Sequence, residues 1–297
     1  METPPSKLRV WALAARPKTL PAAAAPVLIG TAMAWEADAF HAIAFVMCLL
    51  GALLIQIGTN YANDYFDHVK GVDDDERLGP LRVTQAGLVT PRAMRIATVI
   101  VFGLAAMCGL YLVGRAGWPI LVLGVVSLAC GVLYTGGPYP LGYNGWGDLF
   151  VLLFFGFGAV TGTYYTQALK VTPAVVWAGL GPGLFSAAIL GVNNLRDVVA
   201  DRKAGKRTLP IRFGEPFARV AFTLCILLGS LTPVLLTRIE PGHPWACLAV
   251  LVLIPAVPTV LRTVWTETPG PIMNETLAQT GKLLLLYSLL FSIGWMV

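Results

Sequence analysis

The chain has 297 residues, of which 56% are hydrophobic and only 12% are charged. A water-soluble domain carries about 25% charged residues, and the mean hydropathy here is +0.71, so a soluble globular protein is excluded. The net charge of +5 does not indicate a nucleic-acid partner, because in a membrane protein the distribution of the basic residues between the two sides matters more than their sum. Membrane lipid is therefore the expected solvent of most of this chain.

Apolar segments of about 20 residues, long enough to cross a bilayer, follow one another along the chain. They are continuous runs without the alternation of barrel strands, which predicts transmembrane helices and an all-α fold in one domain over 1–297. We expect about nine spans, at residues 20–36, 43–62, 93–113, 118–135, 147–167, 173–194, 217–237, 245–264 and 280–297.

Lys and Arg residues fall almost entirely on one side of these spans. The N-terminal segment and the loops after the second, sixth and eighth spans hold 18 of the 21, and the other side holds only Arg115, Lys170 and Arg238. The positive-inside rule places the basic side in the cytoplasm. We therefore expect a cytoplasmic N-terminus and, with nine spans, a C-terminus outside.

Two polar loops on the basic side begin inside the apolar boundary of their spans. Their acidic and amide side chains keep an i, i+4 spacing, which places each set on one helical face. Oxygen ligands of this kind suit Mg²⁺, which is usually held by a few carboxylates together with substrate phosphates, and strongly polar groups at this membrane depth tend to be functional. The residues are Asn63, Asp64 and Asp67 in the first loop, and Asn193, Asp197 and Asp201 in the second.

Basic residues alternate with these acids, which is the combination that binding of a diphosphate with Mg²⁺ requires. Diphosphate is a good leaving group once Mg²⁺ and cations absorb its charge. An allylic chain would then leave a carbocation for an electron-rich acceptor to capture in a water-poor pocket. The alternative is that both loops are only solvated connections.

The two acidic sets lie 130 residues apart, from Asn63 to Asn193. An even number of predicted spans separates them, so they face the same side of the membrane. This spacing suggests two pseudo-repeat halves, at about 1–135 and 136–297, each contributing one set of metal ligands.

The segments 63–67 (Asn-Asp-Tyr-Phe-Asp) and 197–201 (Asp-Val-Val-Ala-Asp) resemble the two acidic motifs of the UbiA superfamily of intramembrane aromatic prenyltransferases. One departure is Gly71, which stands at the third acidic position of the first motif, with Asp73 two residues further on. The resemblance implies about nine transmembrane helices around a central cavity, Asp-rich cytoplasmic loops, Mg²⁺ as cofactor and a place in the bacterial cytoplasmic membrane.

Three further segments, 16–21, 78–85 and 134–142, are similar to the branch of this superfamily that acts in menaquinone biosynthesis. That resemblance implies transfer of a polyprenyl group from a polyprenyl diphosphate to 1,4-dihydroxy-2-naphthoate, with loss of CO₂ and diphosphate, giving demethylmenaquinone. It also implies roles for individual residues. Asp64, Asp67, Asp197 and Asp201 would be catalytic, and Asn63, Asp67, Asn193, Asp197 and Asp201 would hold metal. The candidate diphosphate contacts would be Lys70, Arg77, Arg82, Arg202 and Lys203. Lys18 and Tyr139 would bind the acceptor.

Other functions stay open on the sequence alone. The acceptor could be another aromatic compound such as 4-hydroxybenzoate. An ion-coupled transporter would also carry carboxylates, but these usually lie near the bilayer midplane, whereas the ones here lie at the ends of spans. A lipid-head-group transferase usually has its aspartates in one close run. Mg²⁺-dependent release of diphosphate from a prenyl donor would separate these possibilities.

Overall fold

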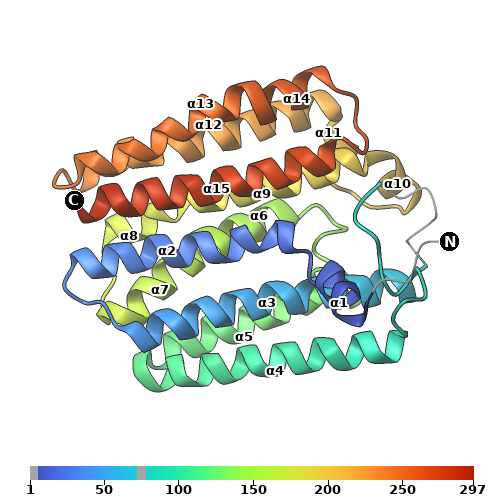
Figure 1. The fold of residues 1–297 in the computed structure, drawn as a ribbon, viewed down its shortest axis with the longest axis horizontal. Helices are drawn as coiled ribbons and strands as arrows, with labels where there is room; N and C mark the ends of the chain where they lie inside the picture. The colour runs from blue at the N-terminus through green and yellow to red at the C-terminus, as the bar shows by residue number, and fades with distance from the viewer. Residues whose placement is uncertain (1–5, 72–77) are drawn as a thin grey trace.

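The computed structural model describes residues 6–71 and 78–297, and this part of the chain is helical without strands, as predicted. Its helices run side by side along the long axis of the molecule (Figure 1). Seven helical stretches within the described residues are long and apolar enough to cross a membrane. They are α3 (Ala42–Val69), α4 (Pro91–Ala116), Gly147–Ala168, Pro173–Arg196, α12 (Glu215–Ile239), Pro244–Thr266 and α15 (Met273–Met296).

Two shorter helices, α2 (Leu20–Glu36) and α5 (Trp118–Leu133), coincide with the remaining predicted spans. At 1.5 Å per residue the 16 residues of α5 reach only about 24 Å, less than the roughly 30 Å hydrocarbon core of a bilayer. The second predicted span is longer than expected, because α3 continues as helix from residue 62 to Val69. This extension carries the first acidic motif on the end of a rigid helix.

Three of the long stretches are interrupted. The first consists of α6 (Gly147–Leu152), a π-helical segment η2 (Leu153–Gly158) and α7 (Ala159–Ala168), and the second of α8 (Pro173–Ala178) and α9 (Leu180–Arg196). The third consists of η3 (Pro244–Val252), α13 (Leu253–Ala256), η4 (Val257–Leu261) and α14 (Arg262–Thr266). Its irregular segments surround Pro255 and Pro258, each of which removes a backbone donor.

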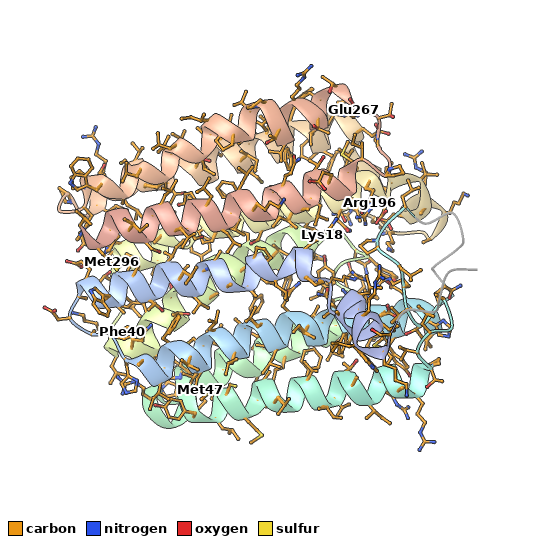
Figure 2. The ribbon with its side chains drawn as sticks, in the orientation of Figure 1. Lys18, Phe40, Met47, Arg196, Glu267 and Met296 are labelled. Carbon is orange, nitrogen blue, oxygen red and sulfur yellow. The ribbon has the colours of Figure 1, made fainter. Side chains whose placement is uncertain are left out.

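The two ends of the bundle differ in polarity. The short helices α1 (Lys7–Ala15), α10 (Val198–Lys203) and α11 (Leu209–Phe213) lie toward one end, and the C-terminus lies at the other (Figure 1). Lys18, Arg196 and Glu267 lie toward the first end, whereas Phe40 and Met296 lie at the second (Figure 2). Both predicted acidic loops therefore share one end of the molecule. That this end faces the cytoplasm stays a prediction.

Candidate active site

A cavity of about 580 Å³ runs through the bundle from the polar end. Its walls come from α2, α3, α4, α5, the Gly147–Ala168 helix and α9. One stripe of α3 follows the whole cavity at helical i, i+3 and i+4 spacing. This stripe is polar toward the first end of the bundle and consists of small or apolar residues toward the other. Its members include Asp67, Asn63, Asn60 and Gln56, followed by Ile55, Ala52, Gly51 and Cys48.

The first arm of the site consists of Asn63, Asp64 and Asp67 on the last turns of α3. Asn63 and Asp67 are buried and line the cavity. The Thr135 hydroxyl donates a hydrogen bond to Asn63 Oδ1 at 2.5 Å. Arg82 forms an ion pair with the Asp67 carboxylate, which also accepts a hydrogen bond from the Tyr143 phenol. The α3 extension thus presents one amide and one carboxylate to the cavity, and both are held in place by neighbours.

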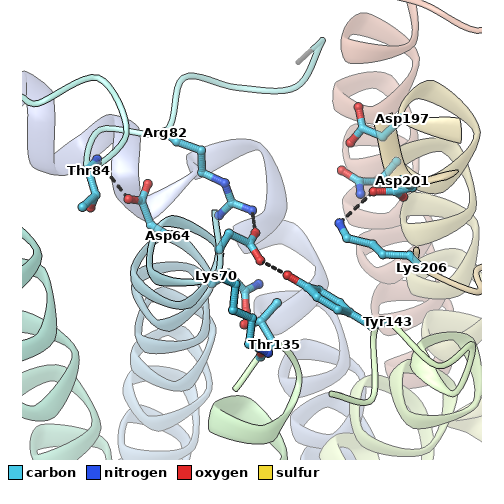
Figure 3. Close-up of polar contacts among 12 residues, drawn as sticks. Asp64, Lys70, Arg82, Thr84, Thr135, Tyr143, Asp197, Asp201 and Lys206 are labelled. Atoms are coloured by element: carbon cyan, nitrogen blue, oxygen red, sulfur yellow. Dashed lines mark hydrogen bonds and ion pairs between the residues drawn. The ribbon is translucent and has the colours of Figure 1, made fainter. Parts of the chain in front are cut away.

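The Asp64 side chain does not line the cavity and instead contacts the loop that follows the first arm. Its carboxylate accepts the backbone N–H of Val83 at 3.1 Å and of Thr84 at 3.0 Å, as Figure 3 shows for Thr84. Asp64 is absent from the described residues that line the cavity. The predicted catalytic role of Asp64 stays a prediction, and in the structure its carboxylate positions the loop that carries Arg82.

The second arm consists of Asn193, Asp197 and Asp201, at the end of α9 and in α10. Arg196, whose side chain is fully buried, donates to both Asp197 oxygens, at 2.8 Å from Nε and 2.5 Å from Nη2. The same guanidinium donates to Asn193 Oδ1 at 2.7 Å and to Asn274 Oδ1 at 2.9 Å. Asn274 in turn donates to the Leu78 carbonyl at 2.8 Å. Arg196 therefore connects the second arm to α15 and to the loop that follows the first arm.

Tyr143, from the loop between α5 and α6, lies between the two arms (Figure 3). Its ring lies 4.9 Å from Lys70 Nζ and 4.8 Å from Lys206 Nζ, measured to the ring centroid, a geometry in which the ring attracts both cations. Lys206 forms an ion pair with Asp201 at 2.7 Å. Partial desolvation of the ammonium group lowers the pKa of Lys70, and the nearby charge of Asp67 partly offsets this. Tyr143 thus connects the Asp67 carboxylate of the first arm to Lys206, the cation that pairs with Asp201 of the second arm.

The predicted cations are not all at the cavity. Arg82 lines it, but Arg202 and Lys203 are exposed and lie outside its lining. Lys70 is exposed but close to Tyr143. Arg77, like Asp73, lies outside the described residues. Lys206, which sequence reasoning did not select, lines the cavity.

The two residues expected to bind the acceptor also lie outside the lining. Lys18, in η1 (Pro17–Thr19), is exposed, and Tyr139 is 58% exposed. Arg16 and Tyr143, from the same two segments, line the cavity instead. The acceptor-binding roles of Lys18 and Tyr139 stay predictions, and in the structure a nearby side chain of each segment lines the cavity. A spacing pattern could not distinguish them, because both segments are loops or short turns.

The oxygen atoms at the cavity mouth fit a magnesium ion. Asn63, Asp67, Asn193, Asp197 and Asp201 all line the same cavity. Among the described residues, no three His, Cys, Asp or Glu side chains lie close enough to hold a metal together. Amide, water and diphosphate oxygens would therefore complete the shell, which is the usual situation of Mg²⁺ in sites that bind phosphates.

A helical membrane bundle with two carboxylate arms and several cations lining one largely apolar cavity is the arrangement expected of an integral membrane enzyme. Residues 23–291 match the UbiA prenyltransferase family. The chain belongs to this family and is a prenyltransferase.

Two curated relatives are similar over nearly the full length. Both are named 1,4-dihydroxy-2-naphthoate octaprenyltransferase. The Escherichia coli (strain K12) protein is 40% identical over 97% of this chain and 96% of its own length. The Mycobacterium tuberculosis protein is 39% identical over 94% of both chains. A solved UbiA homologue from Archaeoglobus fulgidus, bound to DMAPP and Mg²⁺, has a similar fold, with a TM-score of 0.62 at 14% identity over 95% of this chain and 99% of that one.

Proposed function

We propose that this protein transfers a polyprenyl group from a polyprenyl diphosphate to 1,4-dihydroxy-2-naphthoate, with Mg²⁺ as cofactor and loss of CO₂ and diphosphate. The observation that carries the proposal is that Asp67, Asp197 and Asp201 all line one largely apolar cavity. The relatives that bear this activity in their names support the choice of acceptor. The solved homologue bound to DMAPP and Mg²⁺ supports the choice of donor head group and metal.

The acidic and basic side chains that line the cavity would have different roles in this reaction. The carboxylates of Asp67 and Asp201, with the amide oxygen of Asn63, would hold Mg²⁺ against the diphosphate. Bound Mg²⁺ supplies positive charge that stabilises the departing diphosphate. Arg82 and Lys206, which both line the cavity, would contact its oxygens, since guanidinium and ammonium groups bind phosphate strongly. The apolar walls exclude water from the allylic cation.

The bond changes balance without a further reactant. The allylic C–O bond breaks and its electron pair leaves with the diphosphate. A ring carbon of the electron-rich naphthoate forms the new C–C bond, and the electron pair of the bond to the carboxylate returns to the ring as CO₂ leaves. The product of these bond changes is demethylmenaquinol. Its two-electron oxidation to demethylmenaquinone is a separate step that requires an external oxidant. Arg16, rather than Lys18, is the cation of the N-terminal segment that lines the cavity, and we assign it to the acceptor carboxylate.

The test is turnover by the purified protein in detergent with Mg²⁺, a polyprenyl diphosphate and 1,4-dihydroxy-2-naphthoate, followed by mass spectrometry of the prenylated product. Asp67→Asn and Asp201→Asn remove one carboxylate from each arm. Glu267→Gln is the matched control, because Glu267 is an acid toward the same end of the bundle (Figure 2) and lies outside the cavity lining.

We expect product from the wild type and from Glu267→Gln, and loss of product in both Asp variants and with chelator. Product with 4-hydroxybenzoate but none with the naphthoate would refute the proposed acceptor. Unchanged turnover after chelation would refute the role of Mg²⁺. No release of diphosphate from any prenyl donor would refute the whole proposal.

A further inference from the structure

Two amide side chains of α3, Gln56 and Asn60, line the cavity between the acidic residues of the α3 stripe and its small or apolar residues. Both are buried, with 9% and 4% of their surface exposed. Buried amides normally use both the N–H and the C=O group, because a polar group left unpaired out of water costs free energy. The hydrogen bonds of each half therefore indicate the roles of these two side chains.

The N–H groups of both amides bind the N-terminal segment. Asn60 Nδ2 donates to the Ala15 carbonyl at 2.9 Å and to the Thr19 hydroxyl at 3.1 Å. Gln56 Nε2 donates to the same hydroxyl at 3.0 Å. The Thr19 hydroxyl donates its own hydrogen to the Arg16 carbonyl at 3.0 Å. Because a carbonyl can only accept and this hydroxyl has no second hydrogen, both amides must present nitrogen to the segment.

This orientation leaves two amide oxygens, Gln56 Oε1 and Asn60 Oδ1, for another donor. Within the described residues no group donates a hydrogen bond to either oxygen, and neither oxygen is sealed inside the protein. Both oxygens are therefore accessible from the cavity that their side chains line. The two residues are one turn apart on α3, about 6 Å along the helix axis, and both amide nitrogens lie within 3.1 Å of one hydroxyl oxygen. One aromatic ring can span the two oxygens.

Two hydrogen-bond acceptors in this place favour one kind of ligand. A prenyl chain has no hydrogen-bond donor, and a diphosphate is an anion that carbonyl oxygens repel. Phenolic O–H groups are donors, and two of them in para positions on one ring are separated by about one helical turn. The acceptor of the proposed function, 1,4-dihydroxy-2-naphthoate, carries this pair.

The position of Arg16 gives the orientation of the ring. Its side chain is assigned above to the acceptor carboxylate, and Asn60 contacts the preceding residue, Ala15. Asn60 also lies one turn nearer than Gln56 to the acidic end of the α3 stripe. A ring whose carboxylate is held by Arg16 therefore directs the neighbouring 1-hydroxyl to Asn60 and the opposite 4-hydroxyl to Gln56.

We infer that Gln56 and Asn60 determine the specificity for the acceptor: Asn60 Oδ1 accepts a hydrogen bond from its 1-hydroxyl, and Gln56 Oε1 accepts one from its 4-hydroxyl. This inference rests on the proposed function. Each amide then has two roles, because its nitrogen holds the N-terminal segment and its oxygen binds the substrate. Substitutions can separate the two roles.

The test measures the dissociation constants of three ligands by isothermal titration calorimetry of the purified protein. The ligands are 1,4-dihydroxy-2-naphthoate, 1-hydroxy-2-naphthoate, which lacks the 4-hydroxyl, and 4-hydroxy-2-naphthoate, which lacks the 1-hydroxyl. Mg²⁺ and a thiolodiphosphate analogue of the prenyl donor are present, so that the donor site is filled and no turnover occurs. The titrations are anaerobic, which keeps the dihydroxy compound reduced.

Gln56→Met and Asn60→Leu each remove one amide and keep the approximate size of the side chain. Thr19→Val is the control for the structural role, because it removes the hydroxyl that both amide nitrogens contact and keeps both amide oxygens. Gln279→Met is the matched control for the change of residue type, because Gln279 of α15 lies outside the cavity lining.

In the wild type, the loss of either hydroxyl should weaken binding about 10- to 100-fold, since it leaves a buried oxygen unpaired. Gln56→Met should bind 1-hydroxy-2-naphthoate as tightly as the dihydroxy compound and still discriminate against 4-hydroxy-2-naphthoate, and Asn60→Leu should do the reverse. Thr19→Val should weaken all three ligands by the same factor, and Gln279→Met should match the wild type.

The inference is overturned if the wild type binds all three ligands equally, or if either amide variant discriminates against both analogues as the wild type does. A wild type that binds none of the three would refute the proposed function instead. If the amide variants do not fold, cryo-electron microscopy of the wild type with 1,4-dihydroxy-2-naphthoate decides the question. Each ring hydroxyl should lie within hydrogen-bond distance of its amide oxygen, and hydroxyls placed against other groups would overturn the inference.

Discussion

Arg196→Met should destabilise the protein more than the loss of any exposed cation. The Arg196 side chain is fully buried and that of Asp197 is 8% exposed, and two hydrogen bonds of 2.8 and 2.5 Å join them. Removal of one partner from a buried pair leaves the other charge uncompensated and costs about 3–5 kcal/mol. Each kcal/mol lowers the thermal midpoint of a larger domain by about 2–4 °C, so we expect a drop of about 6–20 °C.

The assay is thermal unfolding of the purified protein in detergent. Arg92→Met is the matched control, because Arg92 is an exposed cation at the start of α4, and such changes stay within about 0.5 kcal/mol. The double variant with Asp197→Asn should recover part of the loss, since it no longer buries an unpaired charge. The reasoning is refuted if Arg196→Met is as stable as the control, or if the effects of the two substitutions simply add.

Three further predictions concern the loops around the site. Tyr143→Phe removes the hydrogen bond to the Asp67 carboxylate, which is worth about 1.5–3 kcal/mol, so turnover at limiting Mg²⁺ should fall about 10- to 100-fold. Tyr139→Phe, a change at an exposed tyrosine, should leave turnover unchanged. A Mg²⁺ titration of the rate compares the two variants. Asp64→Ala removes the acceptor of two backbone N–H groups in the 78–90 loop, and limited proteolysis should cut this loop faster, with Asp64→Asn intermediate; wild-type protection would contradict the role. Gly145→Ala should abolish most turnover, because the backbone has φ +78° and the new Cβ would lie 2.6 Å from a carbonyl oxygen; Gly242→Ala, with open space around it, is the control.

The fold was predictable because its signals are spread over many residues. Each span is a long apolar segment, and the location of both acidic loops at one end follows from many Lys and Arg residues together. The end of α3 was harder to predict from the sequence, since the hydropathy falls at residue 62 whereas the helix continues to Val69. Helical spacing of Asn63 and Asp67 was the better guide there, because shared register requires the helix to continue.

The cation that pairs with Asp201 shows why part of the site was not predictable. Arg202 and Lys203 follow it in sequence, but successive side chains on a helix diverge by about 100°, and both are exposed. Lys206 returns to the acid because α10 ends at Lys203 and the chain then reverses at Gly205, whose φ is +69°. The Lys206 N–H donates to the Asp201 carbonyl at 3.0 Å. Helices commonly end at a glycine with positive φ. The glycine in the segment 203–206 (Lys-Ala-Gly-Lys) was therefore the one sequence signal for this chain reversal.

The α3 stripe shows how one helix can match a substrate that is charged at one end and apolar at the other. Its polar half is anchored outside the cavity as well as within it. Gln56 donates to the Thr19 hydroxyl at 3.0 Å, and Asn60 donates to the Ala15 carbonyl at 2.9 Å, so these amides hold the N-terminal segment that carries Arg16 against the site. Beyond them, Ala52, Gly51 and Cys48 on the same stripe are small. Under the proposed function, the change from amide to small side chains on α3 would separate the head group of the donor from its tail. The reactive carbon of the donor would then lie near the polar end of the cavity, on the side of Arg16, to which we assign the acceptor carboxylate.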